Sequence, residues 1–254
     1  ARLALVGREP DRLAALAAEL GPAHAWAECD VTDQPSLDRA VAASVAALGG
    51  LDVVVANAGI ANMGTVAVSP PDALARVIDV NLTGVLRTVS ATLPHVTRRR
   101  GHFLLISSAA AFSGIPGLGA YAASKAGVMH FAHVLRLETA HTGVTVGVAH
   151  PCWIDTDMVR DPRAELPSFE RTLSKLPWPF NTVTPLPDAA DALVEGIARR
   201  RRTIFIPRAL APFAALRGLV TGARVERRLA AIAARTVPEA EREMRALGRA
   251  FGAG

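Results

Sequence analysis

Short apolar runs alternate along the chain with longer stretches in which apolar residues recur every three or four positions. The short runs are typical of strands buried on both faces, and the longer stretches are typical of helices with one apolar side. The predicted strands are residues 3–6, 23–29, 52–56, 102–107, 144–149 and 203–206, and the predicted helices are residues 11–20, 36–48, 71–98, 120–141 and 188–200. This alternation predicts a doubly wound parallel sheet covered by helices on both faces, a three-layer α/β fold.

Polar residues and glycines at the ends of these segments indicate where the helices begin and stop. Asp11 and Ser36 are suited to cap the first two helices, because short polar side chains accept hydrogen bonds from free backbone N–H groups. Gly21, Gly49 and Gly143 are suited to helix exits, where the left-handed conformation is common.

Two segments do not follow the alternation. Residues 157–187 combine prolines, charges and aromatic side chains, so one continuous helix is not expected there; they form either a lid over an apolar substrate or a docked surface loop. Residues 209–254 follow the predicted catalytic domain (residues 1–208) as a helical extension, apolar over 209–220 and charged over 224–249. This extension could cover the substrate pocket, pair with another subunit or rest on a membrane surface.

Composition narrows the class of protein. The chain has 254 residues, 50% of them hydrophobic, which is enough to build the core of one α/β domain. No uninterrupted apolar run reaches the roughly 18–20 residues that a membrane-spanning helix needs. Cys29 and Cys152 have no disulfide or zinc spacing, which predicts a reduced, cytoplasmic setting. The net charge of +5 reflects abundant arginine, and neither a nucleic-acid partner nor a metal site is expected.

The strongest chemical signal is the segment Tyr121-Ala-Ala-Ser-Lys125, which contains the one tyrosine of the chain. Positions i and i+4 lie on the same side of a helix, so the ammonium group would lie beside the phenol. A free tyrosine has a pKa near ~10, and a nearby positive charge lowers it toward neutrality. The pair therefore predicts a general acid/base, although an incidental pair on an exposed helix has the same spacing.

Further polar residues lie at the ends of predicted strands. Ser108 ends the apolar run that begins at His102, and it precedes Tyr121 by thirteen residues. The turn Asn57-Ala58-Gly59 ends the strand before it, and Asn81 lies inside the long predicted helix. Open α/β sheets bind their ligands at the carboxyl ends of the strands, so these residues are expected near one site.

Four features of the sequence resemble the short-chain dehydrogenase/reductase family in their order and spacing. They are the Asn-Ala-Gly turn, the helix asparagine, the serine with its Tyr-x-x-x-Lys pair, and the segment from Pro151 to Thr156. The resemblance covers residues 1 to about 208. It implies a Rossmann-like NAD(P)-binding domain in which Tyr121 is the acid/base and Ser108 holds the substrate oxygen. It also implies that Lys125 lowers the phenol pKa and binds the nicotinamide ribose. Asn81 would bend its helix and hold a water beside Lys125; alternatively, it bonds its own backbone.

The same resemblance implies a set of cofactor contacts. Asp30 would accept from the adenine amine while Val31 packs on the ring, and Asn57, Ala58 and Gly59 would lie beneath the adenosine ribose. Ile154 and Thr156 would meet the nicotinamide carboxamide, although Cys152 replaces the glycine that usually follows the proline. Gly7 stands where an NAD enzyme carries an acid, and Arg8 follows it, so NADP(H) is favoured over NAD(H).

One family element is not found. The family's glycine-rich turn, Thr-Gly-x-x-x-Gly-x-Gly, does not occur, and the chain is expected to begin in the second strand of the fold, without the first strand and that turn. The similar pattern Gly114-Ile-Pro-Gly117-Leu-Gly119 follows the serine strand, so it is expected on the substrate side of the site.

Two classes of function follow. The first is an NAD(P)-dependent oxidoreductase, expected as a homo-oligomer, that interconverts a secondary alcohol and a ketone or aldehyde. The second is a non-catalytic binding or regulatory protein on the same scaffold. Retention of Asn81, Ser108, Tyr121 and Lys125 favours the enzyme, because a scaffold needs none of that chemistry. A lipophilic substrate is expected from the apolar side chains of the two unassigned segments, Trp178, Phe180, Leu210, Phe213, Leu216 and Leu219.

Overall fold

The computed structural model describes residues 1–112, 114–216 and 223–247, and it contains a strand at every predicted position. These strands are β1 (Ala4–Gly7), β2 (Ala25–Glu28), β3 (Val53–Ala56), β4 (His102–Ile106), β5 (Thr145–Pro151) and β8 (Thr203–Ile206). Two further strands that the sequence pattern did not predict, β6 (Trp153–Ile154) and β7 (Val183–Thr184), pair in parallel with each other.

The predicted helices are also present, with one interruption. They are α1 (Pro10–Leu20), α2 (Gln34–Leu48), α3 (Pro71–Ile78), α4 (Gly84–Arg98), α5 (Gly119–Glu138) and α8 (Leu186–Ala198). The single helix expected over 71–98 is wrong in one respect, because the π-helical turn η1 (Asp79–Thr83) separates α3 from α4. The lid segment forms α6 (Asp157–Glu165) and α7 (Pro167–Lys175), and it continues to α8 without a further helix.

Both predicted N-caps are wrong. The first helix begins one residue earlier, at Pro10, and no side chain caps it. The second is capped by Asp33, whose carboxylate accepts from the backbone N–H of Ser36 at 3.1 Å. Asp33 can do this because it precedes the helix in extended conformation, which turns its carboxylate toward the free N–H groups. Gly49 ends that helix in the left-handed conformation, as predicted.

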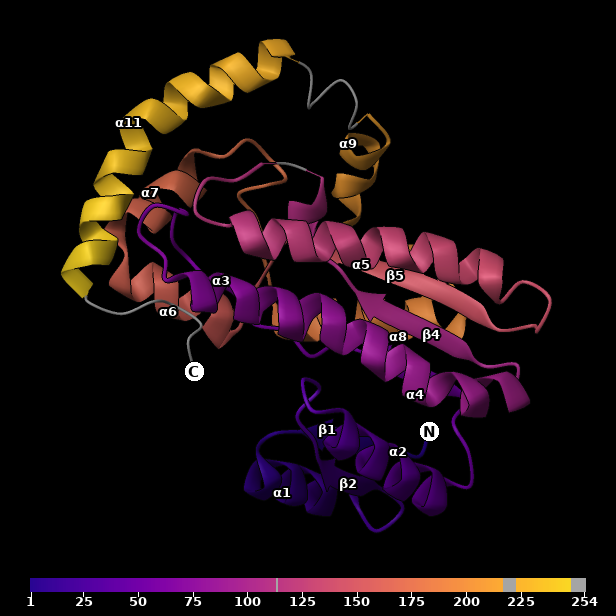
Figure 1. The fold of residues 1–254 in the computed structure, drawn as a ribbon. Coiled ribbons are helices and arrows are strands. Elements are labelled where there is room, and N and C mark those ends of the chain that lie inside the picture. Colours follow the sequence, from indigo (N-terminus) through magenta and orange to yellow (C-terminus); the bar gives the residue numbers. More distant parts are fainter. Residues whose placement is uncertain (113, 217–222, 248–254) are drawn as a thin grey trace.

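The main sheet has the parallel order β3-β4-β5-β8, and helices cover both of its faces. Along β4, Phe103 and Leu105 pack against α4 and α5, whereas Leu104 and Ile106 pack on the other side, against α8. Alternate side chains of a strand point to opposite faces, which is why an uninterrupted apolar run suits this central position. The predicted three-layer α/β fold is confirmed (Figure 1).

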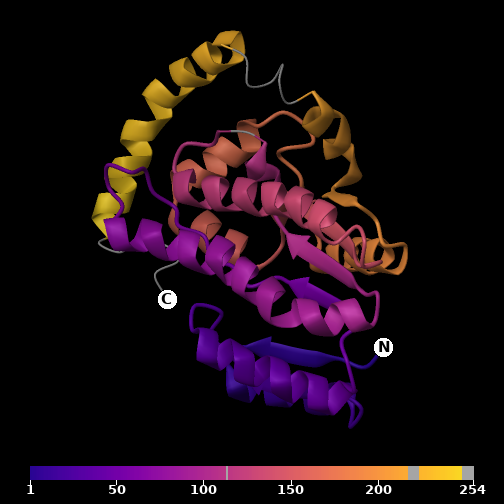
Figure 2. The same cartoon turned by 45° about the vertical axis from the view of Figure 1, so that its right-hand side comes forward.

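The N-terminal strands form a separate parallel pair. β1 is hydrogen-bonded to β2, and α1 and α2 pack against this pair. A small core around Cys29, Leu37 and Ala40 reaches Ala91 of α4, so α2 joins the pair to the rest of the molecule. Figure 2 shows this unit beside α4, with the carboxyl ends of its strands turned toward the end of the main sheet where the site lies.

The C-terminal extension is helical where it is described. After β8 come the 3-10 turn η3 (Arg208–Leu210), α9 (Ala211–Ala215) and the long α11 (Ala223–Leu247). Leu219 and the rest of 217–220, together with residues 248 and 249, lie outside the described residues. α11 lies along α7 at the end of the molecule that also carries α6 (Figure 1). Within the described part of the chain, no helix is both long enough and apolar enough to cross a bilayer.

Candidate active site

Two adjacent serines follow β4 and make different contacts. Ser107 is buried, and its hydroxyl donates to the backbone carbonyl of Lys125 at 2.8 Å, which ties α5 to the strand. Ser108 begins the 3-10 turn η2 (Ala109–Ala111), where its Oγ accepts from the backbone N–H of Ala110 at 3.1 Å and lies 3.3 Å from the carbonyl of Pro151. Ser108 lines a cavity at this edge of the sheet, in agreement with its predicted place in the site.

The predicted serine, tyrosine and lysine come together at the first turns of α5. Tyr121 and Ser108 line the same cavity at the strand end, and the Ser108 hydroxyl acts on the phenol to lower its pKa. Lys125 is buried, with Nζ 5.7 Å from the centroid of the Tyr121 ring. Its ammonium group donates to the backbone carbonyl of Ile106 at 2.9 Å, so both the strand and the helix fix its position.

The direction of the Tyr121 pKa differs from the prediction. Burial raises the pKa of the phenol above its ordinary value, and the hydrogen bond with Ser108 opposes this only in part. Burial also lowers the pKa of the Lys125 ammonium from 10.5 to about 8. The net direction of the phenol pKa is therefore opposite to the expected one, because burial removes the phenolate from water. The ammonium group of Lys125 is directed at a backbone carbonyl, and its effect on the phenol pKa stays a prediction.

Asn81 lies in the π-helical turn η1, where the helix departs from regular geometry, as the resemblance implied. Its side chain does not bond its own helix: Oδ1 accepts from the N–H of Ile60 at 2.8 Å, and Nδ2 donates to the carbonyl of Ile60 at 2.9 Å. Nδ2 also lies 3.1 Å from the hydroxyl of Ser124, which donates to the carbonyl of Tyr121 at 2.7 Å. Asn81 thus fixes the loop after β3 relative to α5, and the water beside Lys125 stays a prediction.

The cavity beside Tyr121 is small and mainly apolar, with a volume of about 70 Å³. The sequence pointed to part of its wall, since Phe180 comes from the predicted lid, and Ile115 and Leu118 come from the glycine-containing loop assigned to the substrate side. Met158, Val159 and Leu176 come from the same predicted lid, whereas the sequence gave no signal for Ala61 and Met63. Cys152 also lines the cavity, and burial raises the pKa of its thiol to about 11, so the thiol stays protonated at neutral pH.

A second cavity of about 310 Å³ lies between the ends of β1, β2 and β3. The structure brings together here six residues predicted to bind the adenosine half of the cofactor: Arg8, Asp30, Val31, Asn57, Ala58 and Gly59. Gly59 links this cavity to Asn81 and Lys125, because a Cβ atom there would lie 3.3 Å from both Asn81 Oδ1 and Lys125 Nζ. The absence of a side chain lets the strand end approach them closely.

The charge pattern of this cavity suits a nucleotide. Oδ1 of Asp30 accepts from the N–H and the hydroxyl of Thr32 at 2.8 and 2.7 Å, which lowers the pKa of Asp30 and holds it as a carboxylate. Arg8 and Arg76 lower it further by their positive charge. Arg76 on α3 also lines the cavity, and sequence reasoning missed it because its place depends on how α3 packs. The residues present fit an adenine nucleotide that carries an anionic group.

Ile154 and Thr156 lie just beyond β5. The chain reaches them through Cys152, whose N–H donates to the carbonyl of Ile206 at 2.8 Å, so the missing glycine does not prevent a regular path. Ile154 belongs to β6 and packs against the core on the α8 side of the sheet. Thr156 precedes the first turn of α6. Their predicted contact with the nicotinamide carboxamide stays a prediction.

Comparison with known proteins gives a consistent result. Residues 1–167 match the family model described as short chain dehydrogenase. An uncharacterized oxidoreductase of Myxococcus xanthus is 35% identical over 185 residues, 72% of this chain and 68% of that protein. The (-)-trans-carveol dehydrogenase of Rhodococcus erythropolis is 40% identical over 135 residues, 52% of this chain and 49% of that protein.

A solved structure shows the same fold. The short chain dehydrogenase/reductase of Burkholderia phymatum in complex with NAD superposes with a TM-score of 0.74 over 86% of this chain and 84% of that chain, at 22% identity. At this identity the likeness concerns the fold alone. Together with the match over residues 1–167 and the grouping of Ser108, Tyr121 and Lys125, it leads to one conclusion. The chain belongs to the short chain dehydrogenase family.

Proposed function

We propose that the protein is an NAD(P)-dependent oxidoreductase that interconverts a secondary alcohol and a ketone or aldehyde on a lipophilic substrate. The observation that carries this proposal is the grouping of Ser108 and Tyr121 at the wall of one apolar cavity, with Nζ of Lys125 5.7 Å from the centroid of the phenol ring. The name of the Rhodococcus relative, a carveol dehydrogenase, agrees with this class of reaction.

The proton chemistry follows from the positions of three side chains. Tyr121 donates its phenol proton to the carbonyl oxygen as negative charge develops there, or removes the proton of an alcohol in the reverse direction. Ser108 donates a hydrogen bond to the same oxygen and holds it near the phenol. Because burial raises the phenol pKa, formation of the phenolate during alcohol oxidation requires stabilisation by a positive charge. The ammonium group of Lys125, 5.7 Å from the centroid of the ring, is proposed to supply it.

The cofactor supplies or accepts the hydride when it is bound. Arg8, Asp30 and Val31 would hold its adenosine half, and Lys125 with the turn at Gly59 would meet the part nearer the catalytic residues. Arg8 and Arg76 lie at the same cavity, which favours NADP(H), because a 2′-phosphate pairs with guanidinium groups. A non-catalytic binding protein would not require a serine, a tyrosine and a buried lysine in this arrangement.

The proposed substrate class can be tested with straight-chain methyl ketones of increasing length. Each added methylene that enters the apolar cavities contributes about 0.8 kcal/mol, so kcat/KM should rise about fourfold per carbon over several carbons. The measurement is oxidation of NADPH, followed by its absorbance. A flat profile, together with faster turnover of polyhydroxylated ketones, would contradict the lipophilic assignment. The absence of turnover with any ketone or alcohol and either cofactor would contradict the enzyme itself.

Cofactor preference can be tested at Gly7. A Cβ atom there would meet only the methyl groups of Leu13, at 3.7 and 3.8 Å, so a side chain fits without displacing the backbone. Gly7→Asp should weaken NADPH binding at least about tenfold through charge repulsion and change NADH binding much less. Titration of cofactor fluorescence measures both affinities, and Gly7→Asn, which adds the same shape without charge, is the matched control. Equal losses for the two cofactors would remove Arg8 and Gly7 from cofactor selection.

A further inference from the structure

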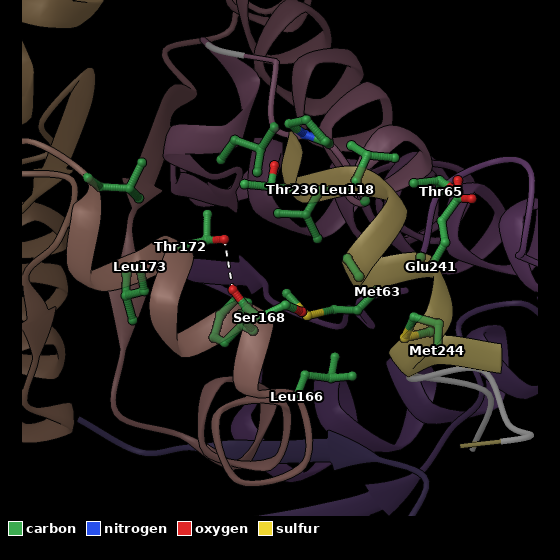
Figure 3. Close-up of a pocket in the computed structure, with 18 of the residues that line it drawn as sticks. Met63, Thr65, Leu118, Leu166, Ser168, Thr172, Leu173, Thr236, Glu241 and Met244 are labelled. Carbon is green, nitrogen blue, oxygen red and sulfur yellow. Dashed lines mark hydrogen bonds between the residues drawn. The ribbon is translucent and has the colours of Figure 1, made fainter. Parts of the chain in front are cut away.

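A larger apolar cavity of about 130 Å³ lies beyond the catalytic one, and α11 forms part of its wall. In Figure 3, Leu173 lies at the left of this space, Leu166 at the bottom and Met244 of α11 at the right, with Leu118 and Met63 between them. The two cavities share five lining residues, namely Met63, Ile115, Leu118, Trp153 and Leu176, so they are neighbours across one wall. A ligand held at Tyr121 would reach α11 by passing between these shared side chains.

Glu241 is the one charged side chain among the described residues that line this outer cavity. Its side chain is only 18% exposed. Oε1 accepts from the hydroxyl of Thr65 at 2.6 Å, and Oε2 lies 3.4 Å from a guanidinium nitrogen of Arg245. In Figure 3 the two side chains of Thr65 and Glu241 meet at one side of the cavity. A carboxylate has about four acceptor positions, so it can still accept from a ligand.

The other polar groups of the cavity do not offer an equivalent acceptor. The hydroxyl of Thr172 donates to the carbonyl of Ser168 at 2.8 Å, and that of Thr236 donates to the carbonyl of Ile232 at 3.2 Å. Their hydroxyl hydrogens are thus used within their own helices, and their oxygens are neutral acceptors, which bind a donor less strongly than a carboxylate does. A carboxylate that faces apolar side chains attracts a hydrogen-bond donor and repels an anion. Glu241 is placed to discriminate between ligands by the chemical group at their remote end.

The neighbouring glutamates of α11 make different contacts. Glu239 and Glu243 both pair with Arg171, at 2.7 and 3.3 Å, and Glu243 also accepts from the N–H of Ser168 at the start of α7. These contacts hold α11 against α7. Glu241 lies on another side of the helix, toward the loop that carries Thr65. A change at Glu241 can thus alter the cavity while the contacts with α7 remain.

We propose that the outer cavity holds the apolar body of the substrate and that Glu241 selects neutral molecules with a hydroxyl group remote from the reacting carbonyl, while excluding carboxylates. This inference rests on the proposed oxidoreductase function and specifies its substrate class, a hydroxylated neutral lipid. Thr65 orients the carboxylate, and Met63 and Met244 provide adaptable apolar walls, since methionine side chains adjust to irregular shapes.

The test uses three probes with the same chain length: a straight-chain methyl ketone, its terminally hydroxylated analogue and the corresponding keto acid. The length is the one at which the unsubstituted ketone binds most tightly. Calorimetric titration of the whole chain measures binding without requiring turnover. Wild-type protein should bind the hydroxy ketone at least about tenfold more tightly than the keto acid, since Glu241 accepts a hydrogen bond from the hydroxyl group and repels a second carboxylate.

Two variants change the remote end in opposite ways. Glu241→Gln keeps the shape and removes the charge, so affinity for the keto acid should rise at least about tenfold. Glu241→Leu also removes the acceptor, so the ratio of hydroxy ketone to unsubstituted ketone affinity should fall at least about tenfold. Glu239→Gln is the matched control, because Glu239 lies on the same helix but pairs with Arg171 outside the cavity. It should leave the relative affinities for the three probes unchanged.

The outcomes separate this inference from the proposed function. If the probes bind but their relative affinities are the same in wild type, Glu241→Gln and Glu241→Leu, the role of Glu241 is overturned while the proposed oxidoreductase function stands. A shift of the same size in Glu239→Gln would also overturn it, because the effect would then come from the docking of α11. If no probe binds and no ketone is reduced, the proposed function itself fails. Thermal unfolding of each variant shows that it is folded, and the isosteric Glu241→Gln provides a readout if Glu241→Leu does not fold.

Discussion

Tyr121→Phe is expected to lower kcat at least about 100-fold while leaving cofactor affinity close to that of the wild type. The substitution keeps the ring that lines the cavity beside Ser108 and removes only the hydroxyl group. The proposed proton donor to the carbonyl oxygen is then lost. Steady-state kinetics with the best methyl ketone, and fluorescence titration with NADPH, measure the two effects.

The same substitution has a clear contradictory result. A phenylalanine variant that turns over at a rate near that of the wild type would remove Tyr121 from the mechanism and leave Ser108 without its partner. A parallel loss of NADPH affinity would instead indicate a change in the shape of the site. Circular dichroism of the variant controls for folding.

Lys125→Met is expected to abolish activity and, at neutral pH, to stabilise the protein. Burial lowers the pKa of Lys125 from 10.5 to about 8, so at pH 7 the folded chain holds a charge that the unfolded chain holds more easily. The corresponding cost to the free energy of unfolding is about 3 kcal/mol. The variant also loses the hydrogen bond to the Ile106 carbonyl, about 1 kcal/mol, so its net gain in stability is smaller by that amount. Methionine fills a similar volume without the charge.

The pH dependence of the free energy of unfolding follows from the direction of this pKa shift. Because the folded-state pKa lies below the unfolded value, the penalty is full below pH 8, decreases as the pH rises, and vanishes above pH 10.5. The stability gain of Lys125→Met over wild type should therefore decrease between these values. Urea unfolding of both proteins at a series of pH values measures it, and other titrating groups cancel in the difference. A gain that does not change with pH, or retained turnover, would contradict this account of Lys125.

Short sequence patterns predicted more of the candidate site residues than of the structure around them. Ser108 and Tyr121 could be paired from sequence because each belongs to a short pattern, a strand end and a helix turn, that the chain forms locally. Asn81 was recognisable as a site residue, but the π-helical turn that carries it was not. That turn is set by hydrogen bonds to Ile60, which lies 21 residues away, and no local pattern specifies such a contact.

The sequence by itself determined the fold class and the strands of the sheet, because these depend on apolar periodicity, and its resemblance to a known family pointed to the four candidate catalytic residues. Only the tertiary structure decided which groups meet at long range. It placed Arg76 at the cavity between the ends of β1, β2 and β3, and it placed Glu241 beside Thr65, 176 residues apart. It also decided the direction of the Tyr121 pKa. The physical reason is common to all three: burial and charge proximity arise from packing between distant segments, and a sequence pattern records only what neighbouring residues do.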